Sequence, residues 1–209
     1  MTFKDREEAG EKLAEKLIQY LGKNKDIVVY ALPRGGVVLG KIVAQMLSAP
    51  LDIIVSKKIG HPYSPEYAVG AVAEDGHMFF NEEEKETINP KWLENEISAK
   101  QNEAIKRRKK YFGEKSITPA EGKIAILVDD GIATGLSMML AITEIKHLKP
   151  KKIIVTIPVV PFDTAEEIRK KVDKLVALDI DKNYIGAVGN YYEFFPQIED
   201  EEVIKILKK

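Results

Sequence analysis

The 209-residue sequence predicts an α/β fold, in which a mainly parallel, doubly wound sheet is flanked by helices. Short apolar runs rich in Ile and Val alternate along the chain with longer amphipathic stretches. Apolar runs of this length are typical of strands buried on both faces of a parallel sheet, whose neighbours are joined by crossovers that are usually helical. The alternation therefore predicts right-handed βαβ units within one domain over residues 1–209.

The first half of the chain begins with an amphipathic helix. Apolar residues recur from Ala9 at four-residue spacing, and Gly22 can end this helix. Proline and glycine residues after the second strand predict a loop, and Asp75-Gly76 predicts a hairpin turn. The predicted elements, in order, are a helix over 5–21, a strand over Ile27–Ala31, a turn over 32–36, a helix over 37–47, a strand over 51–56, a loop over 57–66, and a hairpin of strands 67–73 and 77–80.

The second half continues the alternation after a long, charged helix. Asn89 or Pro90 can begin that helix, and Asp163 with Glu166 three residues on has the pattern of an N-cap. The predicted elements are a helix over 91–111, a strand over Ile124–Val128, a helix over 138–148, a strand over 152–157 ended by Pro158, a helix over 163–172, a strand over 175–178, and a helix over 201–207 capped by Asp200.

The composition excludes several functional classes. Hydrophobic residues make up 44% of the chain and charged residues 31%, and the net charge of −1 gives no general attraction to nucleic acid or anionic membranes. The absence of cysteine excludes disulfides and thiolate metal sites, and the histidines show no metal-ligand spacing. No apolar run approaches the roughly 20 residues needed to span a bilayer. We therefore expect a cytoplasmic protein without nucleic-acid or membrane partners.

One basic cluster, KRRKK at 106–110, is the exception to this even distribution of charge. Such a cluster can contact nucleic acid. However, Glu94, Glu96 and Glu103 lie on the same predicted helix. The pattern therefore favours a solvated helix face.

The stretch IAILVDDGIATGLS at 124–137 carries the strongest functional signal. A buried strand ends at two adjacent carboxylates, Asp129 and Asp130, and a helical pattern starts at Met138. The turn between them consists of small and hydroxylated residues, namely Gly131, Ala133, Thr134, Gly135 and Ser137. Backbone N–H groups at a helix start receive phosphate, while carboxylates accept hydrogen bonds from vicinal hydroxyls. The layout predicts a 5-phosphorylated ribose site, although an acidic turn after a strand is also common in α/β proteins.

The sequence VDDGIATGLSM at 128–138 resembles the phosphoribosyl-pyrophosphate (PRPP) motif of type I phosphoribosyltransferases. Its Ala-Thr-Gly is most similar to the adenine-type enzymes. Leu136 stands where many members have a second small residue. Ala133 stands where enzymes acting on hypoxanthine or guanine carry an Asp base, so the resemblance disfavours those acceptors. The C-terminal YYEFFPQIEDEEV is similar to a group of uncharacterised predicted phosphoribosyltransferases.

A second loop, LPRGG at 32–36, resembles the pyrophosphate loop of this family, in which a non-proline cis peptide is frequent. Here that bond would be Pro33–Arg34. Paired glycines allow the backbone to approach an anion closely, and Arg34 offers a guanidinium. The other interpretation is an ordinary glycine-rich turn with a surface arginine. Lys58, which follows Lys57 at a strand end, can neutralise a leaving pyrophosphate.

The resemblance implies a role for each candidate residue. Asp129 and Asp130 would hold the ribose hydroxyls, and Arg34 and Lys58 would act on the pyrophosphate. The remaining substrate-binding residues are Gly35, Gly36, Gly131, Ala133, Thr134, Gly135, Leu136 and Ser137. No protein metal site is implied, because Mg²⁺ would be bound through PRPP. The partners would be PRPP and a small nitrogen base or nucleoside monophosphate, and the assembly a homodimer.

Two segments can complete the site. Residues 60–66 resemble a shortened lid without Lys or Arg, where His61 could donate a proton or be a solvated loop residue. Residues 82–115 are a predicted helical insertion, and 183–209 are a C-terminal segment that can form the hood over the base. The aromatic residues of 184–196 could stack on a base or pack in the core or a dimer interface. The two resulting hypotheses are a phosphoribosyltransferase and a non-catalytic, regulatory PRPP or nucleotide binder.

Overall fold

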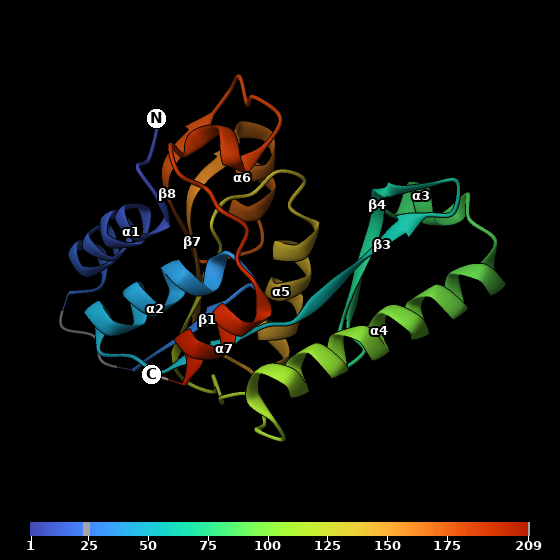
Figure 1. Cartoon of the computed structure of the whole chain (residues 1–209), viewed down its shortest axis with the longest axis horizontal. Helices are drawn as coiled ribbons and strands as arrows, with labels where there is room; N and C mark the ends of the chain where they lie inside the picture. Colours follow the sequence, from blue (N-terminus) through green and yellow to red (C-terminus); the bar gives the residue numbers. More distant parts are fainter. Residues whose placement is uncertain (23–25, 209) are drawn as a thin grey trace.

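A five-stranded parallel sheet forms the centre of the computed structural model, which describes residues 1–22 and 26–208 (Figure 1). The strand order is β2-β1-β6-β7-β8. Strands β2 and β8 therefore lie at the two edges, and β6 lies in the middle. The strands are β1 (Ile27–Ala31), β2 (Leu51–Ile53), β6 (Ile124–Val128), β7 (Lys152–Pro161) and β8 (Lys174–Asp181). This sheet, with helices on both faces, confirms the predicted fold class.

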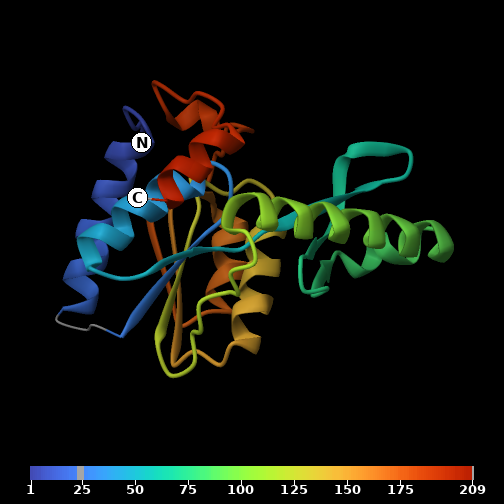
Figure 2. The same ribbon diagram turned by 60° about the horizontal axis from the view of Figure 1, so that its bottom comes forward.

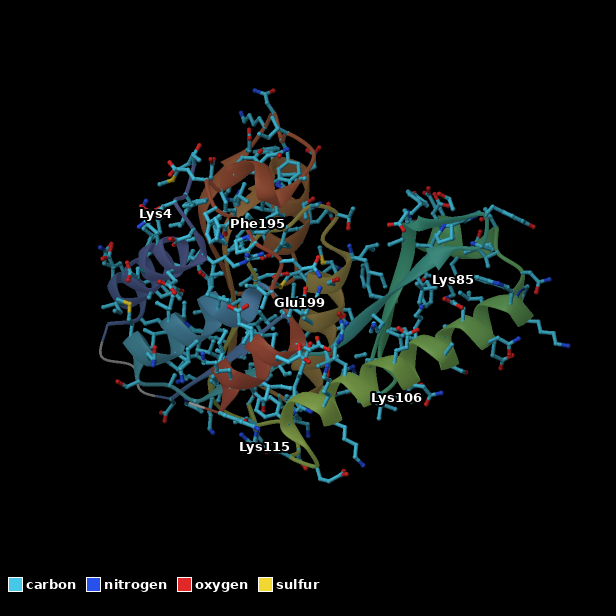
Figure 3. The ribbon with its side chains drawn as sticks, viewed as in Figure 1. Lys4, Lys85, Lys106, Lys115, Phe195 and Glu199 are labelled. Atoms are coloured by element: carbon cyan, nitrogen blue, oxygen red, sulfur yellow. The ribbon has the colours of Figure 1, made fainter. Side chains whose placement is uncertain are left out.

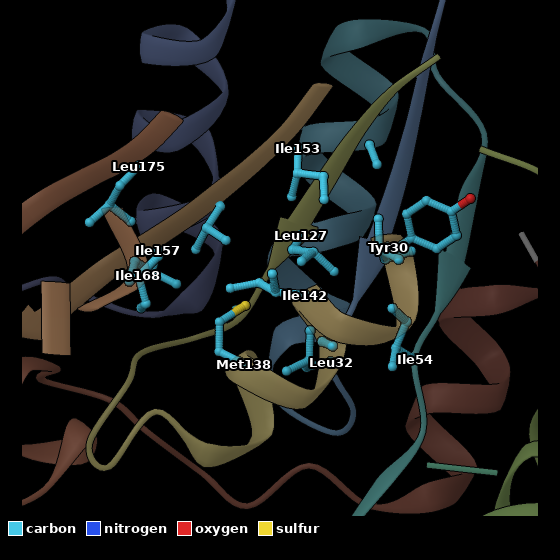
Figure 4. Packing of buried hydrophobic residues seen from close by; sticks show 14 of the residues in the cluster. Tyr30, Leu32, Ile54, Leu127, Met138, Ile142, Ile153, Ile157, Ile168 and Leu175 are labelled. Carbon is cyan, nitrogen blue, oxygen red and sulfur yellow. The ribbon is translucent and has the colours of Figure 1, made fainter. Parts of the chain in front are cut away.

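Alternate residues of each central strand face opposite helical layers. On β1 and β6, Tyr30 and Leu127 belong to one apolar cluster, whereas Val29 and Ile126 belong to another. The first cluster packs on α5 (Leu136–His147) and α6 (Phe162–Arg169), as the close view in Figure 4 shows. The second packs on α1 (Arg6–Leu21) and α2 (Gly36–Leu47). Burial on both faces explains why these strands are continuously apolar in sequence.

A lobe projects from one side of this core (Figures 1 and 2). It contains an antiparallel sheet in the order β3-β4-β5, with α4 packed along it. Its strands are β3 (Ser56–His61), β4 (Ser64–Ala73) and β5 (Met78–Phe80), and its helices are α3 (Glu82–Glu86) and α4 (Pro90–Phe112). The two helices occupy most of the predicted insertion 82–115, and Asn89 caps α4 through its side chain.

The N-terminal residues contact the C-terminal segment on the core. Phe3 pairs with Tyr192, and the Phe3 N–H donates to the carbonyl of Tyr191 at 2.8 Å. The C-terminal segment includes a short 3-10 helix, Val188–Tyr191, and ends in α7 (Asp200–Leu207), which packs on α2 and α4. The C-terminal segment therefore contacts the N-terminal residues, α2 and α4.

The predicted loop over 57–66 is wrong, because these residues form the β3–β4 hairpin. Gly60 pairs with Ala68, but His61 pairs with Ser64, so the register shift leaves Pro65 outside the ladder. A Cβ on Gly60 would lie 2.2 Å from the Pro65 carbonyl oxygen, a contact that only glycine avoids. Glycine and proline thus mark a bulge within the hairpin here, and they do not interrupt it.

Several predicted boundaries are also corrected. Strand β7 continues through Pro158 to Pro161, because Pro158 lies beyond the end of β6 and is passed over in the pairing with β8. Helix α6 starts at Phe162 without a side-chain cap, so Asp163 lies in its first turn. Within the basic cluster, Arg108 is buried and binds Asp52, which corrects the prediction of a fully solvated face.

The helices in the described part of the chain include none that is long and apolar enough to cross a membrane.

Candidate functional site

The acidic pair lies at the carboxyl edge of β6, the central strand of the parallel sheet. This is the edge at which α/β sheets place their ligands. Asp129 and Asp130 directly follow Val128, and the Asp129 Oδ1 accepts the backbone N–H of Asp130 at 2.8 Å. The chain then turns through 131–135 and enters α5 at Leu136. The strand, acidic pair, small-residue turn and helix start therefore occur in space as the sequence predicts.

A cavity of about 80 Å³ lies in this turn. The cavity is lined by Lys58, Asp129, Gly131, Ile132, Ala133, Thr134, Gly135, Leu136, Ser137 and Met138. Ala133 and Thr134 are exposed, while the first N–H groups of α5 have no partner within the helix. All six predicted substrate-binding residues of this loop line one cavity, beside one carboxylate and one lysine. A phosphate fits the unpaired donors and the positive end of the helix dipole.

The glycines of this loop are required by the packing around it. Gly135 has φ +79°, and a Cβ there would lie 2.8 Å from the Thr164 Cγ2. A Cβ on Gly131 would lie 2.4 Å from the Val188 Cγ1. Because Val188 belongs to the C-terminal segment, that segment packs directly against the phosphate loop.

The glycine-rich loop 32–36 is in contact with the acidic pair. A Cβ on Gly35 would lie 1.8 Å from the Asp130 Oδ2, and one on Gly36 would lie 2.9 Å from the Asp129 Cα. The Pro33–Arg34 peptide is cis, as predicted. Gly35 and Gly36 therefore bring the second predicted loop against the first.

The predicted cationic residues divide between two places. Lys58 lines the phosphate cavity, whereas its neighbour Lys57 pairs with Glu103 of α4 at 2.9 Å. Arg34 points toward the C-terminal segment, where its Nη1 lies 3.0 Å from the Glu199 Oε2. The described structure thus brings Lys58 to the cavity but holds Arg34 at an acidic side chain outside it.

Arg6 is a residue of the site that the sequence analysis missed. Its Nε donates to the Asp130 Oδ2 at 2.8 Å, and the side chain is 8% exposed. The sequence did contain an indication of this role. Arg6 lies on the same face of α1 as the apolar residues Ala9 and Leu13. A charged residue in a buried stripe predicts a buried partner, which here is Asp130.

The carboxylates of the pair differ in their surroundings. Burial, reinforced by the charge of Asp130, raises the pKa of the Asp129 carboxyl well above its usual range. Burial also raises the pKa of Asp130, but the Arg6 guanidinium opposes this shift. Proton binding is therefore favoured at Asp129, while Asp130 is the member of the pair with a countercharge.

Aromatic residues of the C-terminal segment pack in the core, which is one of the roles that the sequence left open. Tyr191 and Tyr192 are buried in the core, and the Tyr192 hydroxyl donates to the Asp130 carbonyl at 2.6 Å. The Tyr184 ring stacks on Tyr191 at 5.3 Å, and its hydroxyl has no hydrogen-bond partner within the described residues. Burial raises the pKa of Tyr184 to about 12, and the charge of Asp130 contributes. Tyr184 therefore lies close enough to Asp130 to be influenced by its charge.

Comparison with known proteins agrees with this geometry. The family model described as "Phosphoribosyl transferase domain" matches residues 2–193. The chain belongs to the phosphoribosyl transferase domain family. Two relatives from Mycobacterium tuberculosis strains, each named "Putative phosphoribosyl transferase", are 36% identical over 212 residues, which cover 99% of this chain and 46% of each relative. The phosphoribosyl transferase domain described here thus spans about half the length of these curated relatives.

Solved structures share the architecture of this phosphoribosyl transferase domain. TT1426 from Thermus thermophilus is 35% identical with a TM-score of 0.83, covering 99% of this chain and 98% of its own. The AQ2163 protein from Aquifex aeolicus, at 14% identity and a TM-score of 0.54, covers 84% of this chain and 74% of its own. The prediction of a type I phosphoribosyltransferase from the motif is therefore confirmed at the level of the family.

Proposed function

We propose that the protein transfers the 5-phosphoribosyl group from PRPP to a nitrogen base and releases pyrophosphate. The observation that carries this proposal is the cavity at the start of α5, where the small-residue loop, Lys58 and Asp129 line one space. It offers donors for a 5′-phosphate, acceptors for ribose hydroxyls, and a cation, within one turn of chain. Membership of the phosphoribosyl transferase domain family supports the same reaction class.

In this proposal the residues act mainly through electrostatics and position. The loop 131–137 holds the 5′-phosphate, and Asp129 and Asp130 accept the ribose hydroxyls. Lys58, with Arg34 once it leaves Glu199, neutralises the pyrophosphate as the bond at C1′ breaks. Positive charge grows on the ribose ring at the same time, so fixed dipoles and charges lower the barrier. The β3–β4 hairpin tip, without Lys or Arg at 60–66, would contribute by excluding water.

Mg²⁺ would enter this site bound to PRPP. Among the described residues, no group of three or more His, Cys, Asp or Glu could hold a metal ion. The carboxylates of Asp129 and Asp130 are hard oxygen donors beside the phosphate cavity, and Mg²⁺ prefers such oxygens together with phosphates and waters. When bound with PRPP, the ion would supply charge for the pyrophosphate.

The acceptor is the least constrained part of the proposal. Ala133 has no carboxylate with which to hold or deprotonate N7 of a 6-oxopurine, so we expect hypoxanthine and guanine to be poor acceptors. Adenine, or a base outside the common set, is favoured. Tyr184, which lies within electrostatic reach of Asp130, is the first candidate to contact the base. Turnover of guanine well above adenine would show that the base is recognised by other groups.

A screen of purine and pyrimidine bases with PRPP and Mg²⁺ tests the reaction, with pyrophosphate release as the readout. Release that depends on one base supports the transferase. Binding of PRPP by calorimetry without release under any base would favour the non-catalytic regulatory binder. The same preparation, measured by light scattering with and without PRPP, tests the proposed homodimer.

A further inference from the structure

The Arg6–Asp130 pair joins four separate parts of the chain at the ribose side of the site. Arg6 comes from the first turn of α1, and Asp130 follows β6. The Arg6 Nη1 donates to the Pro196 carbonyl at 2.7 Å, and its guanidinium carbon lies 3.7 Å from the centre of the Phe195 ring. From the fourth side, a Cβ on Gly35 would lie 2.9 Å from the Arg6 Nε. The guanidinium is therefore enclosed by a carboxylate, a carbonyl, an aromatic face and a backbone.

This enclosure fixes the carboxylate as well as the guanidinium. The side chains of Arg6 and Asp130 are 8% and 15% exposed, and the Tyr192 hydroxyl holds the Asp130 carbonyl. A carboxylate has about four acceptor positions, and Arg6 uses only the Oδ2 side. The Asp129 side chain also interacts with this carboxylate. A ligand hydroxyl would use the acceptor positions that remain, in the orientation that Arg6 imposes on the carboxylate.

Stability alone is a weak explanation for a pair in this place. Removing two charges from water costs free energy that their attraction only partly repays, and apolar pairs of similar volume are often as stable. What an apolar pair cannot do is hold an ionised acceptor next to a phosphate cavity.

In Figure 3, Phe195 and Glu199 of the C-terminal segment lie over the core, away from the projecting lobe.

We propose that Arg6 is a positioning residue for ribose, because it orients the Asp130 carboxylate for a vicinal diol and is itself held by Phe195 and Pro196. The inference rests on the proposed function and extends it, since it makes the C-terminal segment part of ribose recognition. Arg6 does not touch the ligand in this proposal. It acts through Asp130, and the segment that faces the base therefore also sets the affinity for the sugar.

The test is a ratio of affinities measured by calorimetry on the full chain. Ribose 5-phosphate and 2-deoxyribose 5-phosphate share the phosphate and differ in one hydroxyl of the diol. We expect the wild-type protein to bind the ribose compound at least tenfold more tightly. Arg6→Met should reduce this ratio to about twofold, with inorganic phosphate bound as in the wild type. Arg6→Lys, which keeps a cation, should restore part of the ratio.

Two further variants keep the test decisive. Lys12→Met removes a cation from the same helix, where Lys12 pairs with Glu8 at 2.8 Å and packs near Phe3, and should leave the ratio unchanged. Phe195→Leu removes the aromatic face but no charge, and should lower the ratio at least twofold even if Arg6→Met fails to fold.

The outcomes separate the two proposals. A wild-type preference for ribose that survives in folded Arg6→Met and in Phe195→Leu overturns the role of Arg6 and leaves the proposed function standing. A tighter ribose 5-phosphate complex in Arg6→Met would show that Arg6 competes with the sugar, which also overturns it. Phosphate binding without any wild-type preference for ribose means that the acidic pair is not a ribose site, and both proposals fail.

Discussion

Replacing Gly35 with alanine should disable the ribose site without any change to a polar side chain. The added methyl group would lie 1.8 Å from the Asp130 Oδ2 and 2.5 Å from its carboxyl carbon, well inside van der Waals contact. The same methyl group would lie 2.9 Å from the Arg6 Nε, so it would crowd both members of the ion pair. The Asp130 side chain must therefore move away from its present position.

The expected loss of affinity for PRPP follows from the loss of the Arg6–Asp130 contact. The Arg6–Asp130 contact at 2.8 Å is a charged hydrogen bond, and such bonds contribute about 1.5–3 kcal/mol. Each 1.4 kcal/mol corresponds to a factor of about ten in an equilibrium constant. We expect Gly35→Ala to weaken PRPP binding roughly 10- to 150-fold, and to lower the melting temperature because the displaced charges are largely buried.

Calorimetric titration with PRPP and Mg²⁺ measures the affinity, and a thermal melt measures the stability. Gly113→Ala is the matched control, since Gly113 has φ +65° and a Cβ there meets nothing within 4 Å. The control should lose about 1 kcal/mol of stability from its backbone conformation but keep its affinity. If Gly35→Ala bound PRPP like the wild type, the contact between the two loops would have no role in the site.

The other predictions concern the phosphate loop, the pyrophosphate loop and the lobe. Gly135→Val should abolish binding of inorganic phosphate by calorimetry, because the side chain would fill the loop at a positive φ; unchanged affinity would refute the phosphate assignment. Glu199→Gln should release Arg34 and lower the KM for PRPP up to about fivefold, as expected for one exposed ion pair, whereas the exposed control Glu201→Gln should not; a raised KM would contradict competition by Glu199. Glu144 has its pKa raised to about 9, mainly by burial, so the wild type should lose stability as the pH rises from the usual glutamate range toward 9. Glu144→Gln should flatten this fall in melting temperature, and an equally steep fall in the variant would place the titration elsewhere.

The sheet and the phosphate loop could be predicted because local sequence determines them. Ile27–Ala31 and Ile124–Val128 have the predicted bounds, since continuous apolar runs between breakers admit few other structures. The turn after Asp130 was predictable because small residues before a helix allow an anion to approach the backbone N–H groups at the start of that helix. The fold class and the phosphate cavity both follow from short local patterns.

The remaining features depend on contacts between distant residues. The β3–β4 hairpin was missed because Gly60 and Pro65 mark turns and bulges alike, and only the partner strand distinguishes them. The sequence predicts a strand end at Pro158, whereas the effect of this proline on the ladder depends on where β6 ends. Arg34 was predicted from its own loop, while its observed partner Glu199 lies 165 residues later. Sequence reasoning therefore located the loops but not the side chains that hold them.

The long-range contacts of Arg6 also determine when the ribose site can form during synthesis. Arg6 is translated 190 positions before its carbonyl acceptor at Pro196. Chains are made from the N-terminus at a few to about 20 residues per second, and domains fold as their parts emerge. The parallel sheet has all five strands by Asp181, whereas the guanidinium is enclosed only when Phe195 and Pro196 leave the ribosome tunnel. If Arg6 positions Asp130 as we propose, a nascent chain stopped before this point would carry the sheet and the loop 131–137, but it would not yet distinguish a ribose from a deoxyribose.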